Sequence, residues 1–111
     1  VQADGRSLLR SGRYAAASRA FTDEARPHRS AYTVQVLVAC SDETLQKTSQ
    51  NVGSETWFII PVTLKGRACH RLCWGTYPTA PEAESALRQL PEYFRAGGAL
   101  PRVVPLASIL P

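Results

Sequence analysis

Two long polar side chains, Gln35 and Arg71, stand in the middle of apolar segments of this 111-residue chain. The segments are Tyr32–Ala39 (YTVQVLVA) and Cys69–Tyr77 (CHRLCWGTY), and both alternate like half-buried β-strands. Burying a polar side chain without a partner costs about 1–3 kcal/mol, so each must reach water, a partner or a ligand. If the two strands are neighbours, Gln35 and Arg71 share one face of a sheet, and that face is a candidate binding surface.

Residues that could do catalytic chemistry do not form such an arrangement. His28 falls in an expected linker, His70 is out of phase with Arg71, and no serine, cysteine or aspartate is spaced to orient either ring. Glu82 and Glu84 do not face each other on a helix, and the sequence has no glycine-rich phosphate loop. We therefore expect a non-catalytic protein that uses no cofactor.

The three cysteines, Cys40, Cys69 and Cys73, lack the spacing of a metal site. Cys69 and Cys73 lie about 13 Å apart along one strand, too far to bond to each other. Cys40 ends one expected strand and Cys69 begins another, so antiparallel pairing of the two strands allows a Cys40–Cys69 disulfide. Three free, half-buried thiols are the alternative.

The charge is unevenly distributed. Residues 1–30 hold six arginines against three carboxylates, whereas residues 31–111 hold seven basic and six acidic groups. The part with the candidate binding face is nearly neutral, which does not suit nucleic acid. No apolar run approaches the roughly 20 residues of a membrane helix, so we expect no membrane contact by this chain. Because the first residue is Val1, we also expect a piece of a longer protein.

Residues 1–30 predict a helical hairpin. Its helices are expected at Gly5–Ser11 and Tyr14–Ala25, with Gly12 as the stop between them, and Arg26–Ser30 as a linker. The spacing of the apolar and small residues resembles the turn and second helix of a tetratricopeptide repeat. The residues that carry this resemblance are Leu9, Gly12, Tyr14, Ala17, Ala20 and Phe21. The hairpin is thus expected as the end of a repeat array or as a packing and linking element.

Residues 31–111 predict an α+β domain with the order strand–helix–strand–strand–helix–strand. Such a βαββαβ order is typical of a ferredoxin-like fold, a four-stranded antiparallel sheet with both helices on one face. Its first and third strands are central, and its other face is open. We expect the elements at 31–39, 42–52, 56–64, 67–75, 81–90 and 102–106, with a further helical turn at 92–96.

Over about residues 31–107, the chain resembles the SPOR domain, a sporulation-related repeat of bacterial cell-envelope proteins. The resemblance rests on Tyr32–Val36 (YTVQV), on Arg71–Tyr77 (RLCWGTY) and on an alanine- and leucine-rich second helix. It implies a periplasmic module that binds peptidoglycan at division sites, in particular glycan strands stripped of their stem peptides. It also implies that Gln35 and Arg71 contact the glycan on the open face.

Four further residues are expected around this face. Leu37 and Cys73 are in phase with Gln35 and Arg71, Tyr77 borders the groove, and Trp57 takes either its rim or the core. Because this face is apolar for a sugar site, a second interpretation is a docking domain for other proteins of the envelope or the division machinery. A third, an RNA-binding sheet, is disfavoured because the in-phase positions carry no aromatic side chain.

Overall fold

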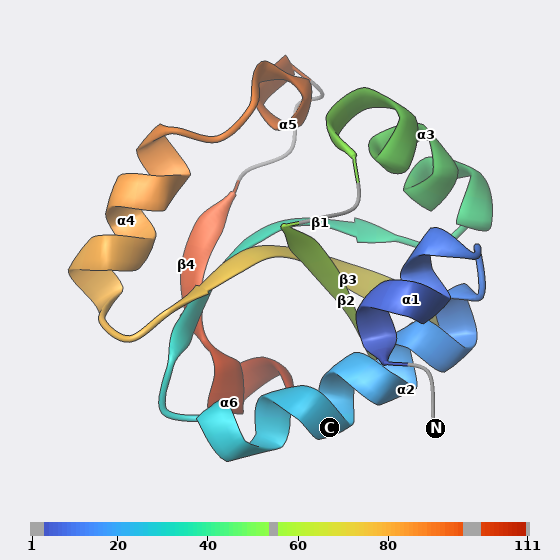
Figure 1. The fold of residues 1–111 in the computed structure, drawn as a ribbon, viewed down its shortest axis with the longest axis horizontal. Coiled ribbons are helices and arrows are strands. Elements are labelled where there is room, and N and C mark those ends of the chain that lie inside the picture. Colours follow the sequence, from blue (N-terminus) through green and yellow to red (C-terminus); the bar gives the residue numbers. More distant parts are fainter. Residues whose placement is uncertain (1–3, 54–55, 97–100, 111) are drawn as a thin grey trace.

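A four-stranded antiparallel sheet with the strand order β2-β3-β1-β4 forms the centre of the structure (Figure 1). The computed structural model describes residues 4–53, 56–96 and 101–110. The strands are β1 (Tyr32–Ala39), β2 (Trp57–Leu64), β3 (Arg67–Tyr77) and β4 (Arg102–Pro105). The α+β class and the antiparallel sheet predicted from the sequence are therefore confirmed, and the strands that carry Gln35 and Arg71 are central neighbours.

Six α-helices and a short 3-10 helix, η1 (Arg26–His28), are described around this sheet. The α-helices are α1 (Gly5–Arg10), α2 (Tyr14–Ala25), α3 (Asp42–Val52), α4 (Ala80–Arg88), α5 (Glu92–Ala96) and α6 (Leu106–Ile109). Neither η1 nor α6 was expected. The Gly97-Gly98 pair, which the sequence predicts as the end of the 92–96 helical turn, lies outside the described residues. Within the described part, no helix has the length and hydropathy needed to cross a membrane.

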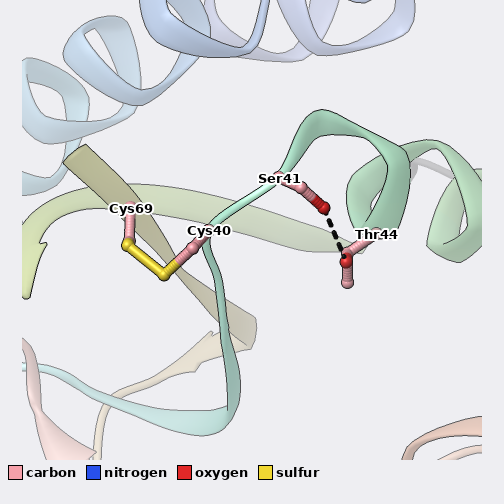
Figure 2. Close-up of a disulfide and its surroundings, with 4 residues drawn as sticks. All are labelled: Cys40, Ser41, Thr44 and Cys69. Atoms are coloured by element: carbon pink, nitrogen blue, oxygen red, sulfur yellow. Dashed lines mark hydrogen bonds between the residues drawn. A yellow bond between two sulfur atoms is a disulfide. The ribbon is translucent and has the colours of Figure 1, made fainter. Parts of the chain in front are cut away.

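Local signals account for the element ends closest to the central strands. Lys65 and Gly66 both have positive φ (50° and 79°), the backbone of a tight turn that joins β2 to β3. Gly53, also at positive φ, ends α3. Ser41 occupies the N-cap position of α3, but its hydroxyl lies 3.2 Å from Thr44 Oγ1 and caps no backbone amide (Figure 2).

Helices cover both faces of the sheet, so the expectation of an open face is wrong. In Figure 1, α2 and α6 lie on one side of the sheet, and α3, α4 and α5 lie on the other. On the Arg71 side, Phe21 of α2 packs against Phe58 of β2 with ring centroids 5.8 Å apart. Phe58 is paired with Cys73, whose side chain shares the face of Arg71. The residues expected to form an exposed groove therefore lie beneath a layer of helices.

The N-terminal helices and residues 31–110 share one hydrophobic core. Leu9, Tyr14, Ala17 and Phe21 are buried in the same cluster as the sheet residues. Gly5 lies so close to Phe21 that a Cβ atom there would approach the ring to 2.7 Å, and its backbone N–H donates to Glu24. The sequence predicted helices over 1–30 as a separate unit, but not that they would pack on this face, because packing partners distant in the chain leave no local signal.

An irregularity in β1 moves Leu37 away from the expected face. Gln35 pairs with Cys73, but Leu37 pairs with Leu72, so β1 has one residue more than β3 between these two pairs. Such a β-bulge reverses the side-chain alternation of the residues that follow it. Leu37 consequently shares the face of Leu72, on the side of α3 and α4, and the prediction that it accompanies Gln35 and Arg71 is wrong.

A disulfide joins the end of β1 to β3. The Sγ atoms of Cys40 and Cys69 are 2.07 Å apart, and Figure 2 shows the bond beside the start of α3. Cys73 is free and fully buried. Of the two alternatives left by the sequence, the structure thus has the Cys40–Cys69 bridge.

We expect Phe21→Ala to destabilise the whole protein, because it removes the ring that joins α2 to the sheet. Truncation of a buried phenylalanine typically lowers the free energy of unfolding by about 3–5 kcal/mol. Urea unfolding followed by circular dichroism measures this loss. The control is Asp23→Ala on the exposed side of α2, which should change stability by no more than about 0.5 kcal/mol. Equal effects of the two substitutions would contradict a shared core.

Loss of the Cys40–Cys69 bridge should also destabilise the fold. The bridge closes a segment of 29 residues, for which loop-closure entropy predicts a contribution of about 3.6 kcal/mol. In urea unfolding, a reductant should therefore lower the stability of the wild type and leave a Cys40→Ala/Cys69→Ala variant unchanged. A wild-type protein that is insensitive to reductant would show that the bridge contributes nothing.

Candidate functional site

Gln35 and Arg71 form a direct hydrogen bond across the two central strands. Nη1 of Arg71 donates to Oε1 of Gln35 over 2.9 Å. Gln35 is directly opposite Cys73 and Arg71 is directly opposite Val38, so the bonded pair lies diagonally across the β1–β3 ladder. Both side chains are half-buried. The structure thus brings together the two residues that the sequence singled out.

The guanidinium of Arg71 is only partly satisfied. Its Nε is buried and has no hydrogen-bond acceptor among the described residues. No ion pair joins Arg71 to a carboxylate in the described part of the chain. A buried donor that belongs to a charged group is costly without an acceptor. Arg71 is therefore the side chain in this site with hydrogen-bonding capacity to spare.

A pocket of about 550 Å³ lies beside Arg71, between α2, the β2–β3 hairpin and α6. Its volume is in the range of sites for small molecules. Apolar side chains such as Val62 and Ile109 form much of the wall, and Arg19 of α2 lines it together with Arg71. Gln35 is not among the lining residues, so a ligand in this pocket would approach the Gln35–Arg71 pair from the side of Arg71.

The other expected site residues do not gather around this pair. Cys73 is fully buried between β1 and β2, and Trp57 is also fully buried, with Nε1 donating to the carbonyl of Gly53 over 2.5 Å. Trp57 therefore belongs to the core and not to a rim. Tyr77 lines a different pocket of about 590 Å³, which it shares with Trp74 and α4. With Leu37 on the opposite face, only Gln35 and Arg71 remain together.

Burial controls the chemistry of Cys73. It raises the pKa of the thiol to about 12, against smaller opposing effects of the Arg71 charge and a hydrogen bond with Thr33. The thiolate is the reactive form of cysteine, so this side chain is unreactive at neutral pH. Cys73 is thus a packing residue beneath the site.

His70 is packed and carries no catalytic arrangement. Its Nδ1 is buried without a partner among the described residues. Desolvation lowers the pKa of His70, and the charge of Asp42 opposes this shift. No group of three or more potential metal ligands occurs in the described part of the chain.

The sequence analysis missed two contributors to the pocket, Arg19 and α6. Arg19 is exposed on α2, and its nearness to Arg71 arises only from the packing of α2. The apolar spacing of Leu106, Ile109 and Leu110 could have predicted a helix with one buried side. No local pattern could have shown that this helix ends beside Arg71.

We expect Gln35 and Arg71 to be energetically coupled. In a double-mutant cycle of Gln35→Leu and Arg71→Met, each single substitution leaves one polar group without its partner, whereas the double variant removes both groups. The coupling free energy from urea unfolding should therefore be about 1–2 kcal/mol. Additive effects within about 0.3 kcal/mol would show that the hydrogen bond has no net role in stability.

Cys73 should resist thiol reagents at pH 8 in the folded protein and react after unfolding. Burial raises the pKa of Cys73 from 9.0 to about 12 in the folded state, so the folded protein keeps the thiol proton to a higher pH than the unfolded chain does. The free energy of unfolding should therefore decrease as the pH rises from 9 to 12. Reagent titration with and without urea measures the first effect, and urea unfolding across this pH range measures the second. Cys73→Ala should show a weaker pH dependence, and rapid labelling of the folded wild type would contradict the assignment.

Comparison with known proteins does not assign this chain to a family. No protein-family model matches the chain, and no curated protein matches it. Its function is therefore inferred from the Gln35–Arg71 pair, the pocket beside it and the sequence segments around both.

Proposed function

We propose that the chain is a non-catalytic peptidoglycan-binding module that recognises glycan strands stripped of their stem peptides. The observation that carries this proposal is the Gln35–Arg71 hydrogen bond beside a pocket of ligand size. A glutamine amide both donates to and accepts from sugar hydroxyl and N-acetyl groups, and the guanidinium adds several donors. Arg71 lines the pocket, so a glycan bound there would meet its guanidinium.

We further propose that residues 31–110 adopt a ferredoxin-like arrangement of the SPOR type. The element order β1-α3-β2-β3-α4-β4, the central position of β1 and β3, and the location of α3 and α4 on one face support it. Because helices cover the Arg71 face, the proposed binding mode of the glycan differs from the one expected from the sequence. The glycan would enter the pocket at the end of this face and would not lie along an open sheet.

The proposed location is the periplasm, at the cell envelope. The Cys40–Cys69 disulfide supports an oxidising compartment, because disulfides are rare where thiols are kept reduced. A division-site location follows only from the resemblance to the SPOR family, so it depends on the same binding activity.

A protein-docking function is the second candidate, and a separate observation favours it. The pocket of about 590 Å³ beside α4 is lined by the half-buried aromatic rings of Trp74 and Tyr77 and by Pro78. Aromatic-walled pockets suit the apolar anchor residues of a protein partner. An envelope or division protein would be the partner in this case.

Binding to purified peptidoglycan sacculi tests the proposal. We expect the protein to sediment with sacculi after amidase treatment and not with intact sacculi, because stem peptides block access to the glycan. Arg71→Ala should weaken binding at least about 10-fold, since hydrogen bonds to charged groups contribute about 1.5–3 kcal/mol. The matched control is Arg26→Ala, which also removes one positive charge, at the exposed C-cap of α2. Absence of binding to either preparation would overturn the proposal and favour protein docking.

A further inference from the structure

The pocket beside Arg71 is assembled from three parts of the chain that are distant in sequence. Ala15, Ser18 and Arg19 come from α2, residues 61–63 and 68–71 come from the β2–β3 hairpin, and residues 108–110 come from α6 and the residue after it. Only the middle part falls in the segments that resemble the SPOR family. The pocket is thus a consequence of how the N-terminal helices pack on the sheet.

The charged groups that line this pocket are all basic. Among the described lining residues are Arg19, Arg71 and the titratable His70, and there is no aspartate or glutamate. In the described structure, neither arginine forms an ion pair. Two uncompensated guanidinium groups at one concave site attract an anion, and each can donate two parallel hydrogen bonds to an oxyanion.

Two of the hydroxyl groups that line the pocket already act as donors within the protein. Ser18 Oγ donates to the carbonyl of Ala15 over 2.9 Å, and Ser108 Oγ donates to the carbonyl of Pro105 over 2.7 Å. The Arg71 Nη1 is likewise engaged by Gln35. The two arginines supply the guanidinium donors of the pocket. Nε of Arg71 is itself buried, so a bound group would reach Arg71 through its terminal nitrogens.

We propose that this pocket binds an oxyanion group between Arg71 of the sheet and Arg19 of α2. The proposal rests on the proposed glycan-binding function and adds to it the chemistry of the recognised group. A stripped glycan strand carries a free carboxylate on each muramic acid residue, and the apolar wall formed by Val62, Ala68 and Ile109 suits the methyl groups of the same sugar. Arg19, which lies in the N-terminal helix α2, is then a residue that determines the specificity of the pocket on the sheet.

The test compares three small probes with the wild-type protein. N-acetylmuramic acid carries the carboxylate, N-acetylglucosamine presents a similar sugar ring without it, and inorganic phosphate is an oxyanion without a sugar. Binding is followed by calorimetry and by the NMR signal of the Arg71 Nε–H. We expect the acidic sugar to bind at least about 10-fold more tightly than the neutral one and to shift this signal. Tighter binding of phosphate would support the oxyanion site and identify phosphate, not an acidic sugar, as its ligand.

Arg19→Gln and Arg26→Gln are the matched variants, because each removes one exposed charge, from the middle of α2 and from its C-cap respectively. Arg19→Gln should weaken oxyanion binding at least about 5-fold and leave the unfolding midpoint unchanged, whereas Arg26→Gln should have no effect on either. Equal effects of the two variants, equal affinity for the neutral sugar, or no binding of any probe would overturn the oxyanion pocket.

The same variants separate this inference from the proposed function. Stripped sacculi that bind the wild type and Arg19→Gln equally would support the glycan-binding module and overturn the oxyanion pocket. Arg19-dependent binding of an oxyanion, together with no binding to sacculi, would support the pocket and overturn the glycan-binding module.

Discussion

The central constraint in this structure is a charged side chain, Arg71, on a sheet face that helices cover. A guanidinium in such a place needs hydrogen-bond acceptors, because its desolvation is otherwise uncompensated. Gln35 provides one acceptor, Nε is buried without one, and Arg71 lines the neighbouring pocket. A completely apolar side chain at this position would pack more easily. The binding function that we propose would give this arginine a role that an apolar side chain could not fill.

The surrounding packing determines how much of this pair a ligand can reach. Phe21 packs on Phe58, and Arg6 of α1 lies over the Phe21 ring at 5.2 Å while it donates to the carbonyl of Trp57. These contacts hold the N-terminal helices on the sheet edge and on the Arg71 face. The accessible surface is thereby reduced from a whole sheet face to a pocket at its end, so a glycan strand would contact this face through one sugar unit and not along its length.

The disulfide and the pocket are parts of the same region. Cys69 lines the pocket, and its bond to Cys40 joins the end of β1 and the start of α3 to the strand that carries Arg71. A cross-link in this position restricts the motion of β1 against β3, on which the Gln35–Arg71 bond depends. Residues positioned by such a rigid support lose less entropy when a ligand binds.

The sequence by itself determined the α+β class, most strand and helix limits, and the pairing of Gln35 with Arg71. Alternation, turn residues and caps are local signals, and a polar side chain within an apolar strand is visible without a structure. Only the tertiary structure decided the rest. One extra residue between two ladder pairs moved Leu37 to the other face, and the packing of α2 and α6 buried the expected groove and placed Arg19 beside Arg71. These outcomes depend on contacts between residues far apart in the chain, which no local pattern encodes.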